Sequence, residues 1–336
     1  MRGLAAGWVL RSGAVEETRA VAEPTEADLE RARVVVAARL RPTPVVGLKL
    51  PGGHGEVLAK LESLQPTGSF KVRGALAAMA AYGAPGVRVV AASAGNHALG
   101  VVFASGCLGV PATVVVPETA SPAKLAALRR LGADLVRHGD GYDRAERHAL
   151  RLASDGAVYV SAYNDPHVIA GQATCAWELA GQVPGEMTVV VPAGGGGLLA
   201  GVALWAAGRP GVRVVGVEAA ASRALSAAAA AGRVVAVPVG ATLADGLAGN
   251  LEQGSVTPAL VAGRVRFAAV SEAEIEAAVR FLALDCGLVV EGAGAVGVAA
   301  LLAGRVPAAG QVVVLLTGRN IDPATLARVL TAAGGP

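Results

Sequence analysis

The sequence predicts an α/β protein whose strands form mostly parallel sheets. Short valine-rich runs, typical of strands buried on both faces, alternate with longer alanine- and leucine-rich segments of helical periodicity. This alternation indicates βαβ units, in which a helix connects two parallel strands. Apolar residues make up 53% of the 336 residues. The chain can therefore bury a large core, and its length allows about two domains of roughly 150 residues each.

The expected strands are, in order, the apolar runs 87–92, 112–116, 158–160, 188–191, 212–217 and 311–316. The expected helices show apolar residues on one face. They cover residues 26–40, 71–81, 94–105, 122–131, 143–153, 171–180 and 272–285. Thr25 and Ser271 are typical N-caps for the first and the last of these helices. The alanine-rich stretch 219–231 is expected to form a helix on propensity alone.

The composition excludes several classes of protein. The net charge is +3, the 29 lysines and arginines are scattered and only 3% of residues are aromatic, which argues against a nucleic-acid partner. Cys107, Cys175 and Cys286 lie far apart without a CxxC pair, so no disulfide framework or zinc site is indicated. No apolar run approaches the roughly 18 residues of a membrane helix, and residues 1–21 make a poor signal peptide. We therefore expect a cytoplasmic protein without nucleic-acid or membrane partners.

The segment 65–74 places a lysine where a helix is expected to begin. Thr67 and Ser69 are good caps and Gly68 permits a tight turn, so the helix should start near Phe70. Lys71 then lies in the first turn, at the positive end of the helix dipole, which disfavours the ammonium form. A neutral amine is the state that a Schiff-base lysine needs. An exposed lysine on a first turn explains this segment equally well.

A second polar turn directly follows the strand at 87–92. It consists of Ser93, Ala94, Gly95, Asn96 and His97. Open α/β sheets bind ligands at the carboxyl ends of their strands, where backbone NH groups and a helix N-terminus can hold an anion. Asn96 is suited to orient a polar group, whereas His97 is expected to pack or cap. An ordinary strand-to-helix turn capped by Ser93 is an equally good interpretation.

A glycine-rich turn follows the strand at 188–191. It consists of Gly194, Gly195, Gly196 and Gly197. Successive glycines leave backbone NH groups uncrowded, as a phosphate cradle requires. The same turn, extended to Ala200, also satisfies the dinucleotide pattern G-x-G-x-x-A, and Glu218 follows about 20 residues on, where a ribose-binding acid would lie. An NAD-dependent oxidoreductase is therefore an alternative interpretation of this segment.

These three turns occur together with Thr317, which offers a hydroxyl just after the strand at 311–316. In this order and spacing, the set resembles the pyridoxal-phosphate enzymes of fold type II, specifically the threonine and serine dehydratase (ammonia-lyase) family. The resemblance covers about residues 24–330. It implies a tryptophan synthase β-like fold, with two open, twisted, mostly parallel sheet domains and pyridoxal 5'-phosphate between them.

The resemblance also implies a domain organisation and a homodimer. Residues 23–83 and 166–336 would form the large domain that binds the cofactor. Residues 84–165 would form a small inserted domain, and residues 1–22 an N-terminal extension.

Each residue that matches the family has an implied role. Lys71 would hold the cofactor as an internal aldimine and then move the α-proton of the substrate. The implied cofactor contacts are Phe70 beside the ring, Asn96 at the 3-hydroxyl, Gly194, Gly195, Gly196 and Gly197 at the phosphate, Thr317 at the pyridine nitrogen and Glu291 close to the ring. The implied substrate contacts are Ser93, Ala94, Gly95, His97, Asn164 and Asp245. A strand-to-helix cap is an equally good interpretation of Glu291.

The implied reaction is β-elimination of water from a small-molecule substrate, a 3-hydroxy amino acid such as L-threonine or L-serine, which yields a 2-oxo acid and ammonia. The C-terminal part also resembles hydroxyectoine-utilisation dehydratases, so bulkier or acidic substrates such as 3-phenylserine, 3-hydroxyaspartate or a hydroxyectoine-derived compound are alternatives. Arg319 replaces a glycine of the family's usual S-G-G-N and is expected to widen the pocket or add a positive charge.

Two departures from the family narrow the expected activity. Serine racemases carry a second serine where this chain has Ala94, so racemisation is disfavoured. Some relatives bind a divalent cation with a glutamate and an aspartate six residues later. Here Glu218 is followed at that spacing by Ala224, so we expect no metal site.

Overall fold

The larger of two sheets draws its strands from both ends of the chain. The computed structural model describes residues 21–51, 57–307 and 310–332, and in it this sheet has the strand order β1-β2-β10-β7-β8-β9. The strands are β1 (Val45–Leu48), β2 (Val57–Lys60), β7 (Met187–Pro192), β8 (Val212–Ala219), β9 (Arg266–Val270) and β10 (Gln311–Leu315). Neighbouring strands are parallel except for β1 and β2, which run antiparallel.

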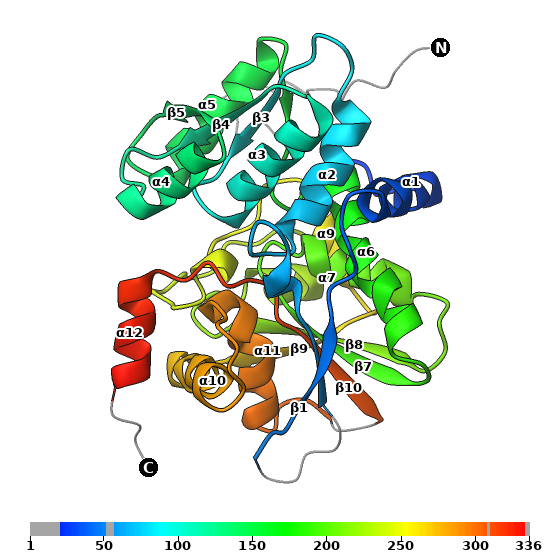
Figure 1. Cartoon of the computed structure of the whole chain (residues 1–336). Coiled ribbons are helices and arrows are strands. Elements are labelled where there is room, and N and C mark those ends of the chain that lie inside the picture. Colours follow the sequence, from blue (N-terminus) through cyan, green and yellow to red (C-terminus); the bar gives the residue numbers. More distant parts are fainter. Residues whose placement is uncertain (1–20, 52–56, 308–309, 333–336) are drawn as a thin grey trace.

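The smaller sheet comes from one continuous part of the chain. Its strands, in the order β5-β4-β3-β6, are all parallel. They are β3 (Val89–Ala92), β4 (Ala112–Val116), β5 (Asp134–Arg137) and β6 (Val158–Tyr159). In Figure 1 this sheet and its helices lie above the larger sheet. The predicted α/β class with two mostly parallel sheets is confirmed, and the domain boundaries at residues 84 and 165 stay a prediction.

Helices cover both faces of each sheet. They are α1 (Glu26–Ala37), α2 (Lys71–Tyr82), α3 (Asn96–Leu108), α4 (Pro122–Arg130), α5 (Tyr142–Ser154), α6 (Pro166–Gln182), α7 (Gly197–Ala206), α8 (Ala224–Ala231), α9 (Thr257–Val261), α10 (Glu272–Leu284), α11 (Gly292–Leu302) and α12 (Pro323–Thr331). Single 3₁₀ turns occur at η1 (Glu62–Leu64) and η2 (Asp245–Leu247).

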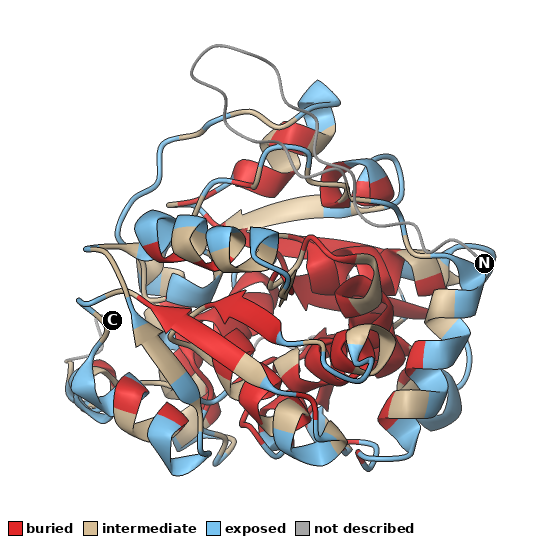
Figure 2. Cartoon of the chain, turned by 90° about the horizontal axis from the view of Figure 1, so that it is seen from above, coloured by how far each residue is buried: buried red, intermediate tan, exposed pale blue. Residues whose placement is uncertain are grey.

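Alternate residues of the central strands enter two different cores. In β10, Val312 and Val314 pack with α10 and α11, whereas Val313 and Leu315 pack with α6 and α7. Successive side chains of a strand point to opposite faces. A strand covered on both faces therefore needs an uninterrupted apolar run, which is the signal that predicted it. Figure 2 shows the buried residues gathered in the interior and the exposed ones on the outer helices.

The six predicted strands are confirmed within two residues at each end, but four others were not predicted. β1, β5 and β9 have partly exposed residues, and each pairs with only one neighbour at a sheet edge. β5 has only two successive apolar residues and Gly47 interrupts β1, whereas β9 contains an apolar run of four residues, 267–270, that was not predicted. β2 ends in a lysine, Lys60, which is nevertheless fully buried.

Several predicted helix bounds were wrong. α6 begins at Pro166 rather than at 171, because the Asp165 carboxylate accepts hydrogen bonds from the NH groups of His167 and Val168. The stretch 219–231 is not one helix, since Ala219 ends β8 and α8 starts only at Ala224. The N-terminal extension lies outside the described residues except for its last two positions.

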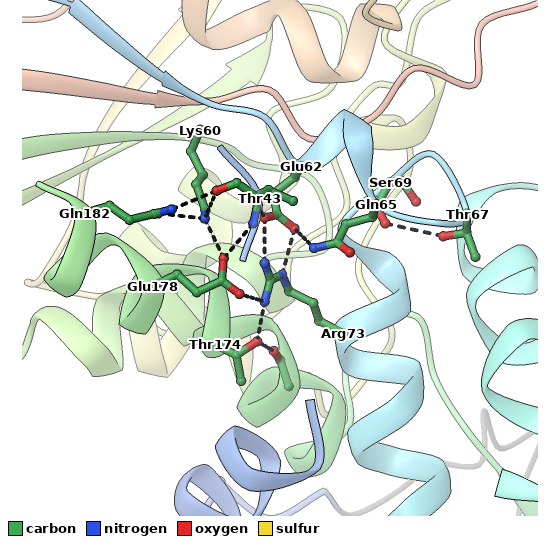
Figure 3. Close-up of polar contacts among 11 residues, drawn as sticks. Thr43, Lys60, Glu62, Gln65, Thr67, Ser69, Arg73, Thr174, Glu178 and Gln182 are labelled. Atoms are coloured by element: carbon green, nitrogen blue, oxygen red, sulfur yellow. Dashed lines mark hydrogen bonds and ion pairs between the residues drawn. The ribbon is translucent and has the colours of Figure 1, made fainter. Parts of the chain in front are cut away.

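A buried network of charged side chains fixes the start of α2 (Figure 3). Arg73 is fully buried and makes two hydrogen bonds to the Glu62 carboxylate, at 2.7 and 2.8 Å. Its third nitrogen donates to Glu178 of α6 at 2.7 Å, and Lys60 pairs with the same carboxylate. Burial raises the pKa of Glu62, but Arg73, the Thr43 hydrogen bond and the Lys60 charge together outweigh burial, so the pKa lies below its usual value. The network ties α2 to η1 and α6.

We expect Arg73→Met to lower the free energy of unfolding by about 3–5 kcal/mol, because it leaves the buried Glu62 carboxylate without its cation. Urea unfolding followed by circular dichroism measures this. The double variant Arg73→Met/Glu62→Gln should lose less than the single variant, since it removes the uncompensated charge. A single variant within about 1 kcal/mol of the parent protein would contradict this account of the network.

Candidate active site

A cleft of about 1700 Å³ opens where the carboxyl ends of the strands of both sheets meet. The turns after β3, β7 and β10 all contribute to its lining, as the rule for ligand sites in open α/β sheets requires. The predicted site residues that line it are Phe70, Lys71, Ser93, Ala94, Gly95, Asn96, His97, Gly194, Gly195, Gly196, Gly197, Asp245, Glu291 and Thr317. The structure thus brings together segments that are far apart in the sequence.

Lys71 is the first residue of α2 and lies in the cleft lining. Its Nζ donates a hydrogen bond of 2.7 Å to the backbone oxygen of Ala162 and lies 5.2 Å from the centre of the Phe70 ring. Burial lowers the pKa of Lys71 to about 8, against a smaller opposing effect of the Glu291 carboxylate. The predicted shift toward a neutral amine is therefore confirmed in direction, and its main cause is desolvation.

The predicted capping of this helix is wrong. Phe70 occupies the N-cap position, and within the described part of the chain no side chain makes a capping bond to it. The preceding segment is instead held against the turn after β10. The NH of Phe70 donates to the carbonyl of Thr317 at 3.0 Å, and the NH of Arg319 donates to the carbonyl of Gly68 at 2.9 Å. Gly68 has φ +76°, as the predicted tight turn requires.

A chain of hydrogen bonds links Asn96, Glu291 and Asn320. Asn96 Nδ2 donates to Glu291 Oε1 at 2.7 Å, and Asn320 Nδ2 donates to Asn96 Oδ1 at 2.6 Å. Burial, with a further effect of Asp245, raises the pKa of Glu291 to about 7. The interpretation of Glu291 as a strand-to-helix cap is wrong in part: it precedes α11, but its carboxylate bonds Asn96, and the described residues 286–290 form no strand. The sequence analysis missed Asn320 as a member of this group.

The turn at 93–97 begins α3 without a side-chain cap from any described residue, since Gly95 holds the N-cap position. Ser93 Oγ instead accepts a hydrogen bond from the NH of Gly95 at 3.1 Å. His97 is buried, and its Nε2 lies 2.9 Å from the backbone oxygen of Val160. Burial and the Lys71 charge lower the pKa of His97 to about 3, so its imidazole is neutral near pH 7. His97 therefore packs beneath the turn, as predicted.

The glycine turn is shaped so that only glycine fits. A Cβ on Gly195 would lie 2.4 Å from the ring of Tyr163, and one on Gly194 would lie 2.8 Å from the backbone of Leu247. Gly196 has φ +89°, a left-handed conformation that side chains disfavour. α7 begins at Gly197, so its unpaired NH groups and positive end meet the cleft. This is a cradle for an anion.

Three predicted features lie elsewhere than expected. Asn164 is buried outside the cleft lining, and its side chain bonds Glu252. Arg319 also lies outside the lining, where its guanidinium donates to the backbone oxygen of Ser63, so it neither widens the cleft nor adds charge there. Glu218 is buried and accepts hydrogen bonds from the first NH groups of α8, at Leu225 and Ser226. It is not presented as a ribose-binding acid, which counts against the NAD interpretation.

Lys124 and Glu252 are among the charged residues of the cleft that were not predicted. Lys124 of α4 lies 3.3 Å from Asp245 of η2, and Glu252 contacts the segment that follows β6. Both line the cleft. Neither belongs to a local motif, because each acquires its neighbours only through folding, so the sequence carries no signal for them.

These residues fit pyridoxal phosphate, the cofactor that the resemblance implies. An amine whose pKa is lowered to about 8 lies in the same cleft as a glycine cradle that any Cβ would fill. Thr317, buried at 3% exposure, contributes to the lining from the third strand end.

Comparisons with known proteins agree with this arrangement. Residues 36–318 match the family described as pyridoxal-phosphate dependent enzyme. An L-threonine ammonia-lyase of Thermotoga maritima is 42% identical over 281 residues, which cover 82% of this chain and 70% of the relative. Among solved structures, a threonine deaminase from T.th. superposes with a TM-score of 0.80 at 36% identity, covering 89% of this chain and 99% of that one. The structure of maize serine racemase superposes with a TM-score of 0.82 at 28% identity, covering 91% of this chain and 97% of that one.

We expect the amine of Lys71 in the cofactor-free protein to react with an acylating reagent with a half-maximal rate near pH 8. Below that pH the amine is protonated and unreactive, and the rate rises as the proton is lost. Competitive labelling followed by mass spectrometry measures the profile, with a lysine in a short peptide as the reference, whose pKa is about 10.4. A profile for Lys71 that matches the peptide would contradict the lowered pKa.

Proposed function

Because the chain belongs to the pyridoxal-phosphate dependent enzyme family, we propose that it eliminates water from L-threonine or L-serine. The released enamine then takes up one water and gives a 2-oxo acid and ammonia. The observation that carries the proposal is the position of Lys71, with its lowered pKa, in the same cleft as the glycine cradle and Thr317. The L-threonine ammonia-lyase relative supports the choice of substrate.

We assign the binding roles as follows. The NH groups of the turn at 194–197 would hold the cofactor phosphate, and Phe70 would pack near the ring. Asn96 would donate to the 3-hydroxyl, and its side chain is oriented by hydrogen bonds with Asn320 and Glu291. When bound, pyridoxal phosphate supplies an electron sink for the bond at the substrate α-carbon. The turn at 93–97 receives the substrate carboxylate.

Lys71 acts as the base that takes the α-proton of the substrate. An amine whose pKa is about 8 is partly neutral near neutral pH, so it can accept a proton and return it. Thr317 would offer the ring nitrogen a hydroxyl rather than a carboxylate. A hydroxyl cannot firmly hold a proton on that nitrogen, so the cofactor would be a weaker electron sink, which favours prompt loss of the β-hydroxyl.

The methyl side chain of Ala94 counts against racemisation as the activity. In this cleft the position that carries a serine in the racemases has a methyl group, which cannot donate a proton to the opposite face of the α-carbon. A substrate with a side-chain carboxylate is a second candidate, because the cation of Lys124 lines the cleft 3.3 Å from Asp245. The family resemblance also supports a homodimer acting in the cytoplasm, where the free thiols of the three cysteines would stay reduced.

The test is 2-oxo acid release by the protein loaded with pyridoxal phosphate. L-threonine, L-serine, 3-phenylserine and 3-hydroxyaspartate are compared, with Lys71→Ala as the control for background. We expect turnover of threonine or serine and at least about a 10³-fold loss in Lys71→Ala, since that variant lacks the base. Turnover of 3-hydroxyaspartate alone would favour the acidic substrate, and full activity in Lys71→Ala would contradict the role of the lysine.

A further inference from the structure

We propose that Glu252 is a positioning residue for Lys71, acting through the segment 161–164. This inference rests on the proposed function, because it concerns the base of that reaction. Glu252 lies in the loop between η2 and α9, about 180 residues after Lys71 in the chain.

The segment 161–164 connects β6 to α6, and its residues Ala162 and Tyr163 line the cleft. The backbone oxygen of Ala162 accepts the hydrogen bond from Lys71 Nζ at 2.7 Å. The next residue, Tyr163, lies against the glycine turn, since a Cβ on Gly195 or Gly197 would collide with it at 2.4 and 2.9 Å. The position of this segment therefore affects both the amine and the anion cradle.

Glu252 holds this segment on both sides of Ala162. Its Oε1 accepts a hydrogen bond from Ser161 Oγ at 2.5 Å, and its Oε2 accepts one from Asn164 Nδ2 at 3.1 Å. Its backbone NH donates to the hydroxyl of Tyr163 at 2.6 Å. One residue thus contacts three of the four residues of the segment, and the fourth is the one that holds Lys71.

The contacts of Glu252 favour a positioning role over substrate binding. Both carboxylate oxygens already accept hydrogen bonds from the segment. Ser161 Oγ also accepts the NH of Asn164 at 3.1 Å, and Asn164 Oδ1 accepts the NH of Val256 at 3.2 Å. The segment is therefore bound by a connected set of hydrogen bonds, and removal of the carboxylate releases two of them.

Release of the segment should act on Lys71 rather than on the substrate. The Ala162 oxygen favours the ammonium form, whereas burial disfavours it, so withdrawal of the segment changes the pKa of Lys71 through both effects. The charge of Glu291 also acts on Lys71, and its carboxylate bonds Asn96 rather than the segment 161–164. His97 faces Lys71 as a neutral imidazole and contacts the backbone of Val160. A displaced amine transfers protons less well, since misplacement by about 1 Å can cost about a hundredfold in rate.

The test compares Glu252→Ala and Glu252→Gln with the control Glu276→Gln. Glu276 is a carboxylate of α10 outside the cleft lining, and it accepts a hydrogen bond from Arg328. Two readouts are made: the pH profile of Lys71 acylation in the full-length cofactor-free protein, and kcat and KM of the loaded enzyme.

For Glu252→Ala we expect the midpoint of acylation to shift away from that of the parent protein and kcat to drop about tenfold or more, with KM within about twofold. Glu252→Gln, which keeps one acceptor, should lie between, and Glu276→Gln should match the parent. An unchanged midpoint in both Glu252 variants would overturn the proposal. The acylation readout needs no substrate, so it separates failure of this inference from failure of the proposed reaction. If Glu252→Ala does not fold, Glu252→Gln decides the outcome.

Discussion

The burial of the Lys71 amine is the constraint on which the rest of the structure depends. An ammonium group removed from water is costly, so a buried lysine has a lowered pKa. The same helix is anchored behind the cleft, because Arg73, two residues after the lysine, is bound by carboxylates of η1 and α6. The Arg73 guanidinium is thus paired with carboxylates, whereas the Lys71 amine in the cleft has a lowered pKa.

The two sheets bring the remaining residues of the cleft together. Because parallel strands end at the same edge, the turns after β3, β7 and β10 converge on one cleft although they lie far apart in the chain. Hydrogen bonds across the cleft then connect the sheets: Asn96 follows the smaller sheet, whereas Glu291 and Asn320 belong to the larger one. The site therefore exists only when both sheets are in place, which explains why its residues come from most of the chain.

Much of this could be predicted from the sequence, and the omissions have physical reasons. Strands buried on both faces are uninterrupted apolar runs, so β4, β7 and β10 were evident, whereas β5 at a sheet edge lacks that signal. Turns that bind through their backbone, such as 194–197, have a composition that indicates their chemistry. Residues such as Glu252 and Asn320 act through contacts with distant segments, and no local pattern indicates such contacts. Arg319 was misjudged because its side chain bonds a backbone oxygen away from the cleft.

The central claim is that Lys71 is the residue that carries the cofactor. The most direct measurement is to load the protein with pyridoxal phosphate, reduce it with borohydride and map the modified peptide by mass spectrometry. The account predicts a pyridoxyl group on Lys71 and no such group at any site in Lys71→Ala treated in the same way. Modification of another lysine, or equal modification of the variant, would contradict it.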